Sequence, residues 1–216
     1  MLLIDKKILI VHMRKCGGTS FCRGLIDILP PERSYYLGYT KESEARSSAS
    51  YREGGPWKHS TAHEAISKMG LNREDLEVYL ISMRPYWERL ASFYLYAARH
   101  HQRDATKYPW VSEITNMSEY LESRFVNRDS VPEFACDPDG NSLVDHFVRF
   151  ESIGSAYSDL CARLGFPDQE IPSLNRNPTV AQDYKSLFND VDWANMKRMF
   201  QPEIDFIDAL PDSKVV

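Results

Sequence analysis

A lysine, two glycines and two hydroxyl residues stand together where an apolar run of the sequence ends. The segment "ILIVHMRKCGGTS" spans residues 8–20, and it closes with Lys15, Cys16, Gly17, Gly18, Thr19 and Ser20. Consecutive glycines allow a tight turn that points backbone N–H groups inward, and a following helix adds free N–H donors at its positive end. Together with the ammonium group of Lys15 and the two hydroxyls, this turn is suited to a phosphate-like anion.

The same segment also fits a purely structural turn. A Gly-Gly turn followed by Thr at the start of a helix is common in proteins. A Walker A loop places its lysine after the second glycine, whereas Lys15 precedes both glycines. The loop alone therefore leaves an anion site and an ordinary turn open.

A second group of polar residues follows the apolar run "VYLISM" at 78–83. Arg84 ends this run, and Pro85 favours an extended backbone at Arg84. Ser92 comes eight residues after Arg84, about two turns into the helix that "YWERLASFYLYAARHH" predicts. A guanidinium with paired donors and a helix hydroxyl are suited to a second phosphate group. Ser92 by itself is better explained as a small packing residue.

Three strand–helix units position these residues. Apolar runs predict strands over 8–13, 78–83 and 143–150, and amphipathic runs predict helices over 20–29, 86–101 and 152–165. This alternation predicts an α/β fold, a three-layer arrangement with a mostly parallel sheet and helices on both faces. Ligands of such sheets bind at the carboxyl ends of the strands, where Lys15 and Arg84 lie.

The remaining segments are expected to be loops, caps and further helices. Polar residues 32–56 predict a loop or mobile flap, and Thr61 with Glu64 forms a capping box for a helix that Gly70 ends. Residues 100–142 predict a helical insertion with a long loop. Residues 190–210 are helical in pattern, and Pro202 should kink that helix or begin a second one. We expect a single domain over 1–216, with acceptor-side insertions at 31–56 and 99–142.

Composition limits the classes of partner. The 216 residues are 43% hydrophobic, enough for a sizeable core, and the net charge of -5 gives no footprint for nucleic-acid binding. The four cysteines lack metal-site spacing, so we expect reduced thiols and no metal. Asp5, Lys6 and Lys7 interrupt the first apolar run, which argues against an export signal or a membrane anchor. These features predict a cytoplasmic protein with no membrane partner.

Five segments of the chain together resemble a known family. In this order and spacing, they resemble sulfotransferases that use 3'-phosphoadenosine 5'-phosphosulfate (PAPS), especially the carbohydrate-type branch with the heparan sulfate and chondroitin enzymes: "ILIVHMRKCGGTS", "HSTAHE", "ISMRPYWERLASFY", "FVRFESI" and "LNRNPT". The resemblance covers 8–30, 57–98, 143–179 and, more weakly, 190–208. It implies a P-loop-like sulfotransferase fold and transfer of a sulfuryl group to the hydroxyl of a glycan or small molecule, with PAPS as co-substrate.

The resemblance also implies roles for individual residues. Lys15 would steady the bridging oxygen and the leaving phosphate, while Gly17, Gly18, Thr19 and Ser20 would hold the 5'-phosphate. Arg84 and Ser92 match the residues that bind the 3'-phosphate, and Asn175 to Thr179 match a loop that closes over the nucleotide. The sequence departs from the family pattern at Arg14 and Cys16, where Pro and Thr are usual, and at Pro85, which stands one place early. The charged and hydroxyl positions remain filled.

A general base completes the expected site. His59 resembles the family's loop histidine, and a neutral imidazole suits proton removal from an acceptor hydroxyl. An ordinary surface or capping histidine is the alternative interpretation. Glu64 is the second candidate base, although the capping box would occupy it. His63 in the first helical turn and His12 in the first strand are expected to be structural, His12 as a satisfied core histidine.

Two further features stay open at this point. Basic residues in 98–107 fit a solvated helix end, or a contact for an anionic acceptor or the 3'-phosphate. Aromatic residues before the expected base are placed to stack on an acceptor: Tyr35, Tyr36, Tyr39 and Trp57. The alternatives to a sulfotransferase are a nucleotide-dependent kinase with a variant phosphate loop, for which the second strand lacks a closing Asp to hold Mg²⁺, and a non-catalytic nucleotide- or glycan-binding module.

Overall fold

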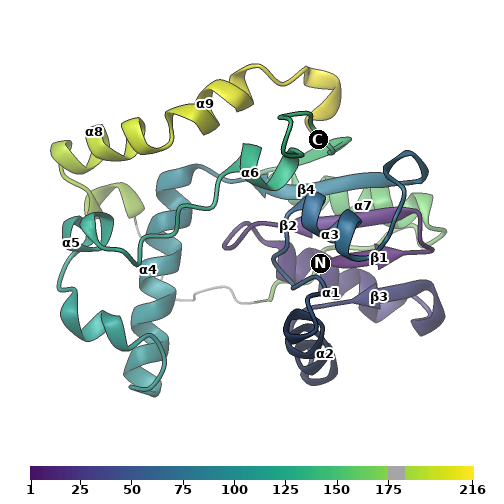
Figure 1. Ribbon diagram of the computed structural model, residues 1–216, viewed down its shortest axis with the longest axis horizontal. Coiled ribbons are helices and arrows are strands. Elements are labelled where there is room, and N and C mark those ends of the chain that lie inside the picture. The colour runs from purple at the N-terminus through teal and green to yellow at the C-terminus, as the bar shows by residue number, and fades with distance from the viewer. Residues whose placement is uncertain (175–182) are drawn as a thin grey trace.

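A mixed five-stranded sheet organises the chain, which a computed structural model describes over residues 1–174 and 183–216. The fold is α/β (Figure 1). Across the sheet the strands lie in the order β3 (Ser34–Tyr36), β1 (Leu2–Ile4), β2 (Ile8–His12), β4 (Glu77–Met83) and β5 (His146–Arg149). The strands expected from the sequence are β2, β4 and β5, and all three form.

The central strands are parallel, as expected, and the other pairings are antiparallel. Ile10 of β2 lies opposite Tyr79 of β4, and Leu80 of β4 lies opposite Phe147 of β5. β1 runs antiparallel to both β2 and β3. The mostly parallel sheet is therefore corrected to a mixed one in which β1 runs against its neighbours.

Neither β1 nor β3 was predicted, and the turn after β1 shows one reason. Asp5 and Lys6 make that turn with φ angles of 50° and 56°. Left-handed residues in hairpin turns are usually Gly or Asn, and this turn has neither. Each of the two strands has only three residues, too few for a visible alternation.

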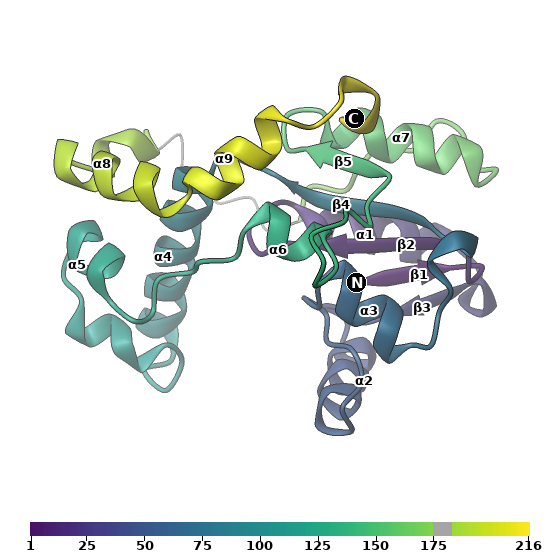
Figure 2. The same ribbon diagram turned by 45° about the horizontal axis from the view of Figure 1, so that its top comes forward.

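Helices cover both faces of the sheet and give three layers. α1 (Gly18–Ile28) and α7 (Ile153–Arg163) contact each other on one face, and α3 (Ala62–Lys68) and α6 (Val131–Ala135) contact each other on the opposite face. Figure 2 shows α3 in front of the sheet and α1 behind it. Both layers bury apolar side chains against the strands, among them Phe21, Leu25, Ala65 and Leu160.

A second hydrophobic cluster lies beside the sheet. It joins the long helix α4 (Tyr86–Arg103) to α5 (Met117–Glu122) and α8 (Asp190–Met199), with Leu90, Tyr120 and Met196 at its centre. Both views place these three helices together at one end of the molecule (Figures 1 and 2). The loop expected within 100–142 also carries the 3₁₀ turn Pro109–Glu113 and α6.

The expected flap at 32–56 is wrong. This region contains the 3₁₀ turn Pro31–Arg33, β3 and the helix α2 (Lys41–Arg52), which Thr40 and Ser43 begin with a capping box. α2 lacks an apolar stripe because the residues that it buries are Ser43 and Ser47. A helix with this composition has no hydrophobic period to detect.

Two local predictions about helix ends are confirmed. Thr61 and Glu64 form the reciprocal capping box of α3, and Gly70 follows its end with a φ of 63°. Pro202 lies in the first turn of α9 (Gln201–Asp208), so the C-terminal region forms a second helix after α8. The four cysteines are free thiols. Over the described ranges, no helix has both the length and the apolar character needed to cross a membrane.

A buried ion pair joins the helical end of the molecule to the sheet. Arg89 Nη2 of α4 donates to both carboxylate oxygens of Glu203 in α9, at 2.8 and 2.7 Å, and the side chains are only 3% and 2% exposed. The Glu203 carboxylate also accepts from the backbone N–H of Val131, the first residue of α6. Arg89 Nη2 donates further to the carbonyl of Asp129. One pair of charges therefore connects α4, α9 and α6.

We expect Arg89→Met to lower the free energy of unfolding by about 3–5 kcal/mol, because it leaves the Glu203 carboxylate buried without its partner. Urea unfolding at pH 7 measures this change. The matched control, Arg23→Met, breaks the exposed pair Arg23–Asp27 and should cost less than about 1 kcal/mol. Equal effects of the two substitutions would contradict the structural role of the buried pair.

Candidate functional site

The turns after the three parallel strands meet at one edge of the sheet. Arg84, after β4, donates from Nη1 to the carbonyl of Lys15, after β2, at 2.8 Å. Phe150, after β5, lies with its ring centre 4.5 Å from the guanidinium carbon of Arg84. A Cβ placed on Gly17 would lie 3.4 Å from the Phe150 ring. The structure thus brings together the two cations that the sequence placed on separate strands.

The turn after β2 contains two residues with left-handed backbone angles. Lys15 and Gly17 have left-handed φ angles of 66° and 85°, and Gly17 is the N-cap of α1. Gly18 packs so closely on His12 that a Cβ there would lie 2.3 Å from the imidazole Cγ. Left-handed residues at the start of a helix turn successive N–H groups toward one side, which creates a concave site for an oxyanion.

Cys16 attaches this turn to the neighbouring strand β4. Its Sγ donates to the carbonyl of Ser82 in β4, at 3.3 Å, and the side chain is buried. Burial raises the pKa of Cys16 to about 11, so the group is a thiol at neutral pH. Cys16, one of the three positions that depart from the sulfotransferase pattern, is therefore a packing residue that attaches the turn to β4.

The two hydroxyl residues after the glycines have different environments. The Ser20 hydroxyl forms hydrogen bonds of 3.3 Å with both the N–H and the carbonyl of Leu174. In this arrangement Ser20 binds protein backbone rather than facing an open anion site. Thr19 is half-buried beside it in the first turn of α1. The expected closing loop, Asn175 to Thr179, lies outside the described residues.

Lys15 has an ammonium group that no carboxylate balances in the described part of the chain. Its Nζ lies 4.1 Å from the centre of the Tyr96 ring of α4, a cation–π contact. Burial, followed by the positive charges of Arg84 and Arg99, lowers the pKa of Lys15 to about 8. The group is still mostly protonated at neutral pH, and an anion would relieve the repulsion.

Arg84 is held in a fixed orientation. Its Nε pairs with Glu88 Oε2 at 3.0 Å, Nη1 donates to Lys15, and the rings of Phe150 and Tyr184 flank the guanidinium. No described residue accepts a hydrogen bond from Nη2. That nitrogen is the donor with which Arg84 can bind a ligand.

Ser92 lies on the side of α4 that faces these cations. Glu88, Ser92 and Tyr96 follow one another at intervals of four residues, so they share one helix face. Glu88 contacts Arg84, and Tyr96 contacts Lys15. Ser92 is half-buried and lies between them on this helix face.

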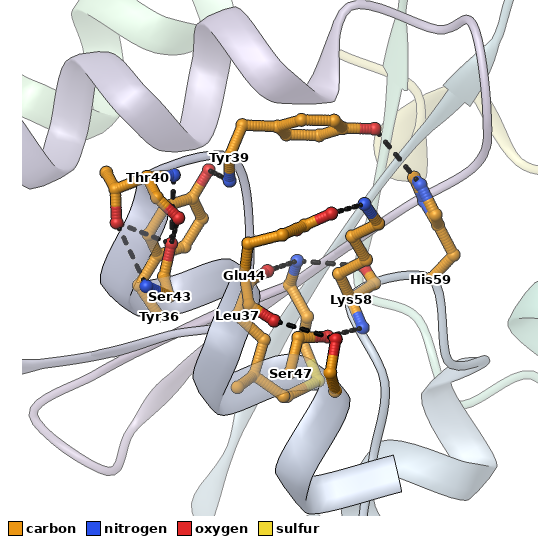
Figure 3. Close-up of polar contacts among 11 residues, drawn as sticks. Tyr36, Leu37, Tyr39, Thr40, Ser43, Glu44, Ser47, Lys58 and His59 are labelled. Carbon is orange, nitrogen blue, oxygen red and sulfur yellow. Dashed lines mark hydrogen bonds and ion pairs between the residues drawn. The ribbon is translucent and has the colours of Figure 1, made fainter. Parts of the chain in front are cut away.

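His59 is a neutral imidazole with a defined tautomer. Its Nδ1 lies 3.3 Å from the carbonyl oxygen of His12, which can only accept, so Nδ1 carries the proton. Nε2 then accepts from the Tyr39 hydroxyl at 3.2 Å (Figure 3). Burial, the N-terminal ammonium and Arg14 lower the pKa of His59 to about 3. The atom that would act as the base is thus engaged by a tyrosine.

The helix α2 positions this tyrosine and the loop that carries His59. The Lys58 ammonium pairs with Glu44 of α2 at 2.5 Å and lies 4.5 Å from the Tyr39 ring centre. The Ser47 hydroxyl accepts from the backbone N–H of Lys58 at 3.1 Å. Figure 3 shows Tyr39, Lys58 and His59 side by side above α2. The region expected to be a flap is an ordered support of the candidate base.

The other candidate acids and bases have structural contacts. Glu64 accepts from the Thr61 N–H and pairs with Lys68, as its capping role predicted. His12 is buried, as expected, and burial lowers its pKa well below the ordinary value. Its Nε2 has no hydrogen-bond partner within the described ranges, so the expected satisfied core histidine is only half right. His12 packs edge-on against His59, with ring centres 4.8 Å apart.

Two contacts of the site were not predicted. Tyr39 was considered for stacking and not as a partner of His59, and their separation of 20 positions in the sequence gives no local signal. Glu88 was also missed, although its position four residues after Arg84 favours an ion pair on a helix. Two surface pockets lie elsewhere, one at Asp5 and Glu77 at the opposite edge of the sheet and one between β3 and α2.

Comparisons with protein-family models, with curated proteins and with solved structures gave no match. Within the described ranges, no three His, Cys, Asp or Glu side chains are grouped as a metal site would require. What is known of this site is therefore its own geometry and charge.

We expect the environment of His59 to make stability depend on pH. The unfolded chain protonates this imidazole near its ordinary pKa of about 6.5, whereas the folded protein resists protonation down to about pH 3. The neutral His59 therefore contributes its full stabilisation above about pH 6.5. This stabilisation is lost as the pH falls from about 6.5 toward 3. Urea unfolding should show that His59→Gln loses less stability than the parent protein between pH 7 and pH 5.

His101→Gln is the matched control, because His101 lies at the far end of α4, where its Nδ1 contacts the carbonyl of Lys107. This variant should keep the parent's dependence on pH. If His59→Gln lost as much stability as the parent, the imidazole would not be held neutral by the fold.

Proposed function

We propose that the protein is a sulfotransferase that moves a sulfuryl group from PAPS to an acceptor hydroxyl of a glycan or small molecule. The supporting observation is the hydrogen bond from Arg84 to the backbone carbonyl of Lys15, which holds the Arg84 guanidinium against the turn that carries Lys15, at the ends of adjacent parallel strands. PAPS carries anionic groups at both the 5' and 3' positions. Two cationic sites held at a constant separation are what such a donor requires.

Each anionic group has a matching part of the site. The left-handed turn, the free N–H groups of α1 and the Lys15 ammonium would hold the 5'-phosphosulfate. Arg84, through Nη2, and the Ser92 hydroxyl would hold the 3'-phosphate. A P-loop-like sulfotransferase fold is part of this proposal, and the parallel strands β2, β4 and β5 with their strand–turn–helix connections agree with it.

The reaction is an in-line displacement at sulfur. The acceptor oxygen attacks the sulfur atom, and the new O–S bond forms as the S–O bond to the 5'-phosphate breaks. The hydroxyl proton passes to Nε2 of His59, and the bond's electron pair leaves on the phosphate oxygen of adenosine 3',5'-bisphosphate, where Lys15 would stabilise the charge. A base in this position contributes about 10²- to 10⁴-fold to the rate.

His59 needs two changes before it can act as this base. The acceptor hydroxyl must replace the Tyr39 hydroxyl at Nε2, and burial raises the pKa of Tyr39 to about 12, so the phenol remains a donor until then. A bound anion would oppose the positive charges of the N-terminal ammonium and Arg14, which lower the pKa of His59. Burial, the largest cause of the lowered pKa, would remain, so the anion would offset only the part that is due to these charges.

The Tyr39–His59 contact also favours a second candidate function. If Tyr39 never leaves Nε2, the same cations would bind a nucleotide without removing a proton from an acceptor. The protein would then be a non-catalytic binding module. Transfer and binding must be measured separately to distinguish the two.

We expect the purified protein to transfer label from sulfur-35 PAPS to members of a library of hydroxyl acceptors. Lys15→Ala should lower kcat/KM by about 100-fold or more, and His59→Gln should lower kcat by about 10²- to 10⁴-fold. Lys7→Ala, at the opposite end of the sheet, is the control and should transfer normally. Tight binding of adenosine 3',5'-bisphosphate without transfer would support the binding module, and absence of both would contradict the proposal.

We expect Glu88→Gln to tighten the binding of adenosine 3',5'-bisphosphate by about two- to fivefold, the range of a partly exposed ion pair. The reason is that the Glu88 carboxylate competes with a phosphate for the Arg84 guanidinium. Isothermal titration calorimetry measures the affinity. Asp27→Asn removes the same charge from an exposed pair and should leave the affinity unchanged; unchanged or weaker binding by Glu88→Gln would exclude this competition.

A further inference from the structure

The helix α4 carries a third cation on the face that meets Lys15 and Arg84. Arg99 follows Tyr96 by three residues and Ser92 by seven, spacings that keep all three on one side of a helix. Because Tyr96 contacts the Lys15 ammonium, Arg99 lies one turn further along α4 from that contact. Lys15 follows β2, Arg84 follows β4, and Arg99 belongs to α4.

One donor of the Arg99 guanidinium has no hydrogen-bond partner in the described part of the chain. Its Nε is buried, and no residue in the described ranges accepts a hydrogen bond from it. The two other arginines toward the start of α4 differ, since Arg84 pairs with Glu88 and Arg89 pairs with Glu203. Arginine stays charged at any physiological pH, and a buried donor without an acceptor is unfavourable. A ligand oxygen would remove this cost.

The surroundings of Arg99 are positive. The Lys15 ammonium lies against Tyr96, one turn before Arg99 on the same face of α4. In agreement with this placement, the charge of Arg99 contributes to the lowered pKa of Lys15, after burial and Arg84. His100 stacks on Tyr96 with ring centres 4.1 Å apart, and burial followed by nearby cations lowers its pKa as well. The nearby carboxylate of Asp104 lies 4.0 Å from Lys107. These groups favour an anion at the Tyr96 surface of α4.

We propose that Arg99 and Lys15 together bind a tetrahedral oxyanion, a phosphate or sulfate group, beside Tyr96. The Nε and Nη donors of a guanidinium form a fork that matches two oxygens of such a group, and the Lys15 ammonium adds a point charge. The group can belong to the nucleotide or to an acceptor that already carries a sulfate or phosphate. The inference rests on the proposed function for the identity of the ligand, whereas the anion site itself requires only the cations.

Calorimetric titration of the full chain with inorganic sulfate tests the site. Arg99→Gln should weaken sulfate binding by about tenfold or more, the effect of losing a charge-assisted hydrogen bond. Arg103→Gln, four residues further on the exposed end of α4, should bind as the parent does. Arg99→Lys, which keeps the charge, should retain part of the affinity and shows that the fold tolerates a change at this position.

Two further titrations identify the source of the group. A parallel loss of affinity for adenosine 3',5'-bisphosphate in Arg99→Gln assigns the oxyanion to the nucleotide. Loss of affinity for a sulfated monosaccharide, with bisphosphate binding unchanged, assigns it to the acceptor. Sulfate binding that is absent in the parent, or equal in Arg99→Gln and the parent, overturns the inference. Weaker sulfate binding by Arg99→Gln in a protein that transfers no label would contradict the proposed function and leave the anion site supported.

Discussion

The ion pair between Arg89 and Glu203 determines how the two ends of the molecule meet. The face of α4 that carries Ser92, Tyr96 and Arg99 meets the turn after β2, where Tyr96 contacts Lys15. Arg89 lies in the first turn of the same helix, so its contacts with α9 and the start of α6 help to fix the direction of that face. A buried charge pair tolerates little displacement, because separating its members leaves two ions in a poorly solvated interior.

The local charge of the site is opposite to that of the whole chain. The protein has a net charge of -5, yet Lys15 lies within the influence of the positive charges of Arg84 and Arg99, and Glu88 is the carboxylate that pairs with Arg84 in the described structure. Such an arrangement costs free energy because like charges repel. The stabilising energy of the rest of the fold maintains it.

The sequence predicted elements that are long or have a distinct local signal. The three parallel strands, the capping box at Thr61 and the helix beginning at Pro202 belong to this group. β1, β3 and α2 were missed because two strands are too short for a period and the helix buries serines. The meeting of Lys15 with Arg84 followed from the topology, but the contact of Tyr39 with His59 depends on how α2 packs, which no local pattern encodes. The resemblance to sulfotransferases remains a prediction.

The buried thiol of Cys16 makes the opening of the turn after β2 chemically measurable. Its sulfur lies beneath the backbone that would enclose an anion, bonded to the Ser82 carbonyl and shielded from solvent. An alkylating reagent can reach this sulfur only when the turn separates from β4, and the high pKa keeps the thiolate fraction small even then. The rate at which Cys16 is modified is therefore a measure of how often the turn opens, obtained without knowing the acceptor.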